Sequence, residues 1–91
     1  MKIFKAISRN AFLNADCFGE FYLETDEVKG KTLHRIIGLE KNFDVIEGAE
    51  INRSIVLAEF NDENKRKIAF NSFLNYLTNP VECRPFRFWY G

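Results

Sequence analysis

The most regular pattern of apolar and polar positions lies in the second half of the chain, over residues 62–78. Apolar side chains recur there at the spacing of one helix face, namely Phe70, Phe73, Leu74 and Leu77, with Ile68 and Ala69 widening the stripe. Asn61-Asp62-Glu63 indicates an N-cap followed by an acidic first turn. Pro80 cannot continue a helix, and Asn79 tolerates the left-handed conformation that often ends one. The pattern therefore predicts a helix over residues 62–78 whose apolar stripe packs in the core.

The rest of the chain carries alternating or β-branched apolar runs, which are typical of strands. These runs cover residues 2–8, 18–25, 32–40, 53–60 and 84–90. Lys29-Gly30-Lys31 predicts the turn of a hairpin with a loose loop between the second and third runs, and Glu47-Gly48 predicts another turn. Two assignments stay open, because residues 9–16 suit a short helix or a loop and residues 51–58 also fit a helical face.

The alternation also assigns side chains to opposite faces of the predicted strands. It places Phe21 and Leu23 opposite Glu20, Tyr22 and Glu24, and it places Leu33, Ile37 and Leu39 opposite Thr32, His34 and Glu40. In the C-terminal run it places Phe86, Phe88 and Tyr90 toward the core, with Arg87 and Trp89 outward. The predicted fold is α+β: a mostly antiparallel sheet of four or five strands with one long helix packed on one face. The 91 residues fit a single domain over residues 1–91.

Charge and aromatic content indicate what kind of partner the chain suits. The 13 basic and 13 acidic residues cancel, which argues against a general polyanion binder. The charges are segregated, however, since residues 1–15 carry +3 (three bases, no acid), residues 16–50 carry −5 (four bases, nine acids) and residues 51–91 carry +2 (six bases, four acids). The 10 phenylalanines are many for so small a core, and large exposed apolar patches usually mark partner sites.

The N-terminal residues and the cysteines bear on the compartment. Lys2, Lys5 and Arg9 interrupt the first apolar run, so we expect no signal peptide, and no apolar stretch reaches the length of a membrane span. We therefore expect a cytoplasmic protein with no membrane partner. Cys17 and Cys83 should then be free thiols, each with a small buried side chain.

No pattern of catalytic chemistry stands out in this sequence. The glycines form neither a dinucleotide-binding fingerprint nor a phosphate-binding loop, and Cys17, Cys83 and His34 lack the spacing of a zinc site. Acidic pairs such as Glu20 and Glu24 lie in a polar stretch, whereas acid–base catalysis needs one carboxyl group that is desolvated. We therefore expect no enzyme, no catalytic residue, no cofactor and no metal.

Candidate binding residues come from the C-terminal run, the strand at residues 18–25 and the start of the helix. They are Arg84, Arg87, Trp89, Tyr22, Lys65 and Arg66. Trp and Arg are enriched in protein-binding hot spots, while interleaved Arg and aromatic residues also suit stacking on nucleobases. The simplest alternative is a terminal strand that serves only the fold.

The expected function is therefore binding. We expect a non-enzymatic protein that binds another protein as a regulator, adaptor or inhibitor, a group that includes phage and mobile-element proteins. The alternative is a nucleic-acid-binding domain that uses the basic termini and the aromatic C-terminal strand, and a small enzyme with an unrecognised site comes third. Homodimerisation through an open sheet edge or the aromatic C-terminus is compatible with all three.

Overall fold

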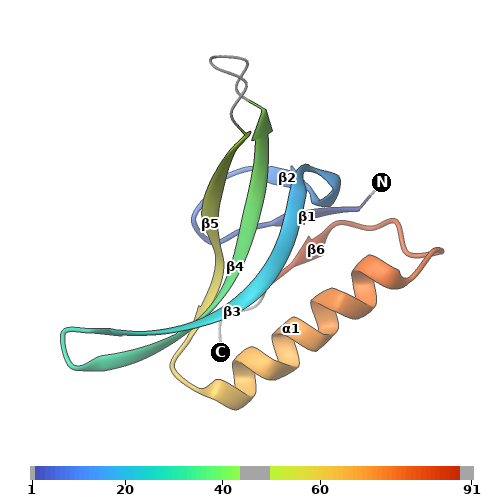
Figure 1. Ribbon diagram of the computed structural model, residues 1–91. Helices are drawn as coiled ribbons and strands as arrows, with labels where there is room; N and C mark the ends of the chain where they lie inside the picture. The colour runs from blue at the N-terminus through green and yellow to red at the C-terminus, as the bar shows by residue number, and fades with distance from the viewer. Residues whose placement is uncertain (1, 44–49, 89–91) are drawn as a thin grey trace.

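The computed structural model describes residues 2–43 and 50–88 and combines six strands with one α-helix (Figure 1). The elements in chain order are β1 (Ile3–Lys5), β2 (Phe12–Asn14), a 3-10 turn (Ala15–Cys17), β3 (Phe18–Val28), β4 (Lys31–Phe43), β5 (Glu50–Phe60), α1 (Glu63–Thr78) and β6 (Phe86–Arg87). The predicted α+β class is confirmed. The predicted turn at Glu47-Gly48, the outward Trp89 and the core assignment of Tyr90 lie outside the described residues.

The strands form two sheets of three, where the sequence predicted one sheet of four or five. The large sheet has the order β3-β4-β5 and is antiparallel throughout. The small sheet has the order β2-β1-β6, with β1 antiparallel to β2 and parallel to β6. The expected sheet divides because the strands of the small sheet are only two or three residues long. They pair with each other and not with β3.

The predicted hairpin is confirmed as β3 and β4, but its loop is tight, not loose as predicted, because both strands continue up to the turn. Val28 pairs with Lys31, so the connection is a two-residue turn of Lys29 and Gly30. Both turn residues have positive φ, at 54° for Lys29 and 78° for Gly30. Two consecutive left-handed residues fit the twist of the flanking strands, and glycine adopts this conformation without strain.

Of the two open assignments, residues 51–58 are strand, whereas residues 9–16 combine a short strand with part of a 3-10 turn. Residues 51–58 belong to β5, whose pairing with β4 shifts register between Ile36 and Ile37. Residues 9–16 contain β2 and the start of the 3-10 turn. The N-terminal strand is shorter than predicted, because the chain turns after Ala6 with the Arg9 amide bonded to the Ala6 carbonyl.

Helix α1 begins and ends where its caps predicted. The side chain of Asp62 accepts a hydrogen bond of 2.8 Å from the Asn64 amide, which satisfies one of the unpaired donors of the first turn. The C-cap Asn79 is extended (φ −83°, ψ 110°), so the left-handed stop was predicted wrongly. Extended backbone is what a residue before proline prefers, and the Asn79 side chain accepts from the Val81 amide.

The buried face of α1 is rotated from the predicted stripe. The buried residues are Arg66, Ala69, Phe73 and Tyr76, with Phe70 and Leu77 partly buried beside them. Leu74 is exposed and Ile68 is 59% exposed, so both were wrongly assigned to the core. The predicted stripe was too wide because apolar residues occupy more of the helix than the face that meets the sheet.

Phenylalanine side chains join the two sheets and the helix into one core. The Phe4 ring of β1 lies 5.4 Å from the Phe18 ring, 5.1 Å from Phe73 and 6.4 Å from Phe88. Phe86 and Phe88 both contact Phe73, as the alternation of the C-terminal run predicted. Most of the phenylalanine side chains therefore pack in the core. Of the strand predicted over residues 84–90, β6 contains Phe86 and Arg87.

The two sheets also meet along the edge of β5. The Ile7 amide donates to the Leu57 carbonyl at 3.0 Å, and the Ser8 hydroxyl donates to the Val56 carbonyl at 2.6 Å. These bonds use backbone acceptors where Leu57 bulges from the β4–β5 ladder. Within the described residues, no helix is long and apolar enough to cross a membrane.

Candidate binding surfaces

The large sheet turns one face toward α1 and the other away from it (Figure 1). Ile36, Ala58 and Phe60 belong to the core face. The opposite face, here called the open face, consists of cross-strand rows: Glu20–Leu39–Ser54, Tyr22–Ile37–Val56, Glu24–Arg35–Glu59 and Asp26–Leu33. An apolar row therefore lies between two polar ones.

The apolar row of the open face is well packed. Ile37 is only 2% exposed although it lies outside the core cluster, because Tyr22 and Val56 flank it on the neighbouring strands. Tyr22, Leu39 and Val56 are each half-buried. A half-exposed apolar centre with a polar rim is the usual anatomy of a protein interface.

Arg35 holds the carboxylates of this face in place. Its guanidinium donates to Glu59 at 2.7 Å and to Asp26 at 3.0 Å, and it lies 3.8 Å from Glu24. The hydrogen bond with Glu59, together with the nearby carboxylates, raises the pKa of Arg35. Among the described side chains of this face, four are carboxylates (Glu20, Glu24, Asp26 and Glu59) and three are cations (Arg35, Lys41 and Lys31, which pairs with Val28), so the open face is acidic by one charge.

The small sheet presents a basic and aromatic row on its surface. Register places Lys5 of β1 between Phe12 of β2 and Arg87 of β6. The Arg87 guanidinium lies 5.2 Å from the centre of the Phe12 ring, and that ring is 44% exposed. The next row, Leu13–Phe4–Phe86, belongs to the core, so the two sides of this sheet differ sharply.

A cleft of about 470 Å³ adjoins this row and is here called the basic cleft. Its lining comprises residues 5–10 together with Arg87 and Phe88. Lys5, Arg9 and Arg87 supply three positive charges, and none of the described residues that line it carries a carboxylate. The Ile7 and Ser8 hydrogen bonds to β5 fix the loop that carries Arg9.

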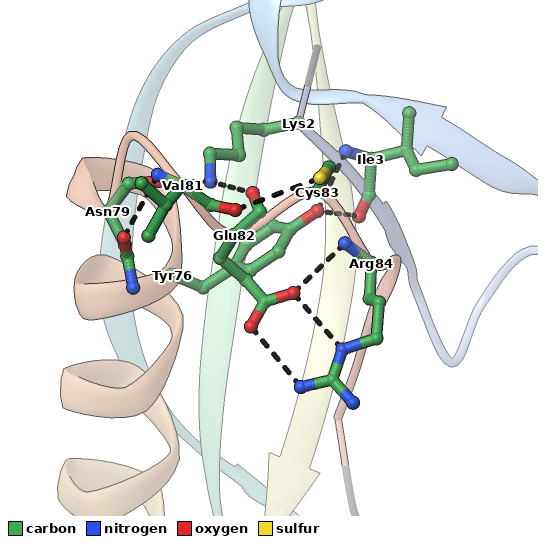
Figure 2. Close-up of polar contacts among 8 residues, drawn as sticks. All are labelled: Lys2, Ile3, Tyr76, Asn79, Val81, Glu82, Cys83 and Arg84. Atoms are coloured by element: carbon green, nitrogen blue, oxygen red, sulfur yellow. Dashed lines mark hydrogen bonds and ion pairs between the residues drawn. The ribbon is translucent and has the colours of Figure 1, made fainter.

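Lys2, near the N-terminus, donates hydrogen bonds to the segment that follows α1, residues 79–82 (Figure 2). The Lys2 ammonium donates to the carbonyls of Asn79 and Glu82 and lies 4.7 Å from the centre of the Tyr76 ring. The Tyr76 hydroxyl donates to the Ile3 carbonyl at 2.9 Å. These contacts position β6 beside β1, which is the pairing that brings Arg87 to Lys5.

Arg84 lies in the same segment and is engaged locally. Its guanidinium donates to Glu82 at 3.2 and 3.4 Å, and its amide donates to the same carboxylate at 3.0 Å (Figure 2). These hydrogen bonds lower the pKa of Glu82. The Arg84 side chain is 88% exposed, so it stays accessible to a partner.

Arg66 has a structural position that the sequence did not reveal. It is 7% exposed and donates to the Glu24 carbonyl at 2.9 Å and to the Thr25 hydroxyl at 3.0 Å. We predicted Arg66 as a partner-binding residue, but its burial against the edge of β3 removes it from that set. Lys65, its neighbour, is exposed on α1.

The candidate residues thus separate into different surfaces. Arg87 lies at the basic cleft, Tyr22 on the open face and Lys65 on the solvent side of α1. Sequence analysis missed Lys5, Arg9 and Phe12, which meet Arg87 only through the parallel pairing of β1 with β6. The only sequence signal for them was the basic character of both termini.

The two cysteines and His34 do not form a site among the described residues. Cys17 and Cys83 are free, and both are exposed, not buried as we predicted. The Nδ1 atom of His34 lies 3.5 Å from the Thr25 hydroxyl. In the part of the chain that the structure describes, no His, Cys, Asp and Glu side chains cluster as a metal site would require.

Comparison with known proteins gives no relative for this chain. No protein-family model matches it, and searches of curated proteins and of solved structures return no significant match.

Proposed function

We propose that this protein acts by binding a protein partner, as a regulator, adaptor or inhibitor, and that the open face is its principal contact surface. The observation that carries the proposal is the apolar row Tyr22–Ile37–Val56 between polar rows. Residues of an apolar centre supply binding energy by burial, while the charged rim selects the partner.

The charge of the open face sets the kind of partner. Its four carboxylates against three cations favour a partner surface that carries lysine or arginine around an apolar centre. Arg35 keeps three of those carboxylates in fixed positions, so little side-chain entropy is lost when they meet a cation. The free thiols suit a reducing compartment, and we place this activity in the cytoplasm.

Charge reversal on opposite faces of one strand tests the proposal. Glu20→Lys combined with Tyr22→Ala alters the open face, whereas Glu27→Lys changes the same charge at an exposed position of β3 on the other side. A lysate from the source cells is passed over the wild type and both variants, and captured proteins are identified by mass spectrometry. A specific protein should be retained by the wild type and by Glu27→Lys, and its affinity should drop at least tenfold with the open-face variant.

One outcome of this binding experiment would contradict the proposal. If every specific partner binds the open-face variant as tightly as the wild type, the interface lies elsewhere and the assignment of the open face is wrong. Circular dichroism of each variant establishes that it is folded before binding is compared.

A further inference from the structure

The basic cleft has a different chemistry from the open face and is independent of the function proposed above. We propose that the basic cleft and the adjoining Phe12 bind single-stranded nucleic acid, with Lys5, Arg9 and Arg87 on the phosphates and Phe12 against a base. Lys5, Arg9 and Arg87 line the cleft, and Phe12 lies in the same surface row as Lys5 and Arg87.

The charges of the basic cleft favour an anion. Among the described residues, Lys5, Arg9 and Arg87 form no ion pair within the protein, whereas Arg35, Arg66 and Arg84 each pair with a carboxylate. Three cations that converge on one cleft repel each other, and an anion relieves that repulsion. Phosphate is the anion that arginine recognises best, because the planar guanidinium presents two parallel N–H groups to its oxygens.

Backbone hydrogen bonds hold the three cations of the cleft in place. Lys5 and Arg87 lie on paired strands, and the loop with Arg9 is held by the Ile7 and Ser8 hydrogen bonds to β5. The cations are therefore presented from a fixed backbone. A preorganised site loses less conformational entropy on binding than a flexible basic tail.

The Phe12 ring favours nucleic acid over an acidic protein as the ligand of this cleft. Phe12 is an exposed ring on the same surface row as Lys5 and Arg87. A base stacks on such a ring or on a guanidinium plane, whereas a glutamate side chain gains no stacking interaction with the ring. Interleaved aromatic and basic side chains on a sheet surface are the common means of binding unpaired strands.

The balanced charge of the chain limits the expected affinity. Three phosphate contacts at about 0.7 released counterions each give a slope near −2 for log K against log salt. Affinity should thus fall about 15- to 20-fold between 50 and 200 mM salt. This modest dependence separates a local site from a general polyanion binder.

The test is fluorescence anisotropy with a labelled 12-nucleotide oligothymidylate and the full chain. The site variants are Arg9→Ala with Arg87→Ala, and Phe12→Ala alone; Lys65→Ala with Lys67→Ala removes the same charge from exposed positions of α1. We expect the double cleft variant to lose at least about tenfold in affinity and to show a slope near −0.7. We expect Phe12→Ala to lose at least about fivefold, Phe12→Trp to retain binding, and the α1 variant to bind like the wild type.

Three outcomes would overturn this inference. The first is no binding to the oligonucleotide at 50 mM salt. The second is an equal loss in the α1 variant, which would mean non-specific attraction. The third is tighter binding of a labelled polyglutamate peptide that does not depend on Phe12, which would assign the cleft to an acidic protein segment. None of these results involves the open face, so the two proposals fail separately.

Discussion

At the scale of single residues, two neighbouring cations on α1 differ in burial. Arg66 is buried and donates to the Glu24 carbonyl and the Thr25 hydroxyl, whereas Lys65 is exposed. The Glu24 carbonyl belongs to an edge strand, so Arg66 satisfies an acceptor that no further strand would reach. Nothing in the run Lys65-Arg66-Lys67 distinguishes the structural cation, because its role depends on the position of β3.

We therefore predict that Arg66→Ala destabilises the fold while Lys65→Ala does not. Loss of the charge-assisted hydrogen bonds and of the buried side chain should lower the free energy of unfolding by about 1–3 kcal/mol. Lys65→Ala should stay within about 0.5 kcal/mol of the wild type. Urea denaturation followed by circular dichroism measures both. Equal stabilities for the two variants would show that the Arg66 contacts contribute nothing to the fold.

A second residue-scale prediction concerns the titration of Glu82. The Arg84 guanidinium and amide stabilise its ionised form, which holds its pKa below the ordinary value and delays protonation as the pH falls. Arg84→Ala removes the side-chain bonds, which are the largest cause, so the pKa of Glu82 should rise. Arg87→Ala should leave it unchanged. Side-chain carboxyl shifts recorded by NMR across the acidic range report the pKa, and an unchanged value in Arg84→Ala would contradict the pairing.

At the scale of elements, local signals predicted well and distant pairings did not. The N-cap of α1, its last residue and the position of the Lys29-Gly30 turn are set by a few adjacent residues, and all three were found from the sequence. The small sheet pairs β1 with β6 across most of the chain, and no local pattern encodes that contact. The basic cleft depends on this pairing, so only Arg87 of its cations was a candidate from the sequence.

The burial of Ile36 shows a subtler limit at the same scale. Alternation placed Leu33, Ile37 and Leu39 on one face, and that assignment is correct. The core, however, takes Ile36 from the other face and the bulged Leu57 from β5. Gly38 makes this packing feasible, since a Cβ there would lie 2.8 Å from the Phe18 ring. A strand with apolar residues on both faces does not reveal which face the helix covers.

The β3–β4 turn yields a prediction for the hairpin. Lys29 and Gly30 both have positive φ, and nothing lies near the position of a Cβ on Gly30. Gly30→Val should therefore destabilise through backbone strain alone, by about 1–3 kcal/mol. Lys29→Asn should raise the melting temperature slightly, because asparagine tolerates the left-handed region better than lysine. If Gly30→Val melts with the wild type, the turn has a different conformation from the one described.

At the scale of the whole molecule, the charge segregation of the sequence becomes a separation of surfaces. Carboxylates from the acidic middle of the chain gather on the open face, and basic residues from both termini meet at the basic cleft. The zero net charge therefore conceals two surfaces of opposite sign. Each has its own apolar or aromatic component, Tyr22 with Val56 on one and Phe12 on the other.

The two surfaces are held together by a core that both sheets share, which predicts unfolding as a single unit. The Phe4 ring of the small sheet contacts Phe18 and Phe21 of β3 and Phe73 of α1, and it is fully buried. Phe4→Ala should lower the free energy of unfolding by about 3–5 kcal/mol, a large part of the stability of a small domain.

Native-state hydrogen exchange reveals whether the loss of stability in Phe4→Ala affects the small sheet and α1 equally. Because Ile7 is bonded to Leu57 across the two sheets, its amide and the central amides of α1 should open together. Phe4→Ala should then reduce the protection of both by the same free energy, while Val81→Ala at an exposed position changes neither. If protection falls only in β1 and β2 and the α1 amides keep their wild-type values, the small sheet is a separate unit. The basic cleft could then change shape without disturbing the open face.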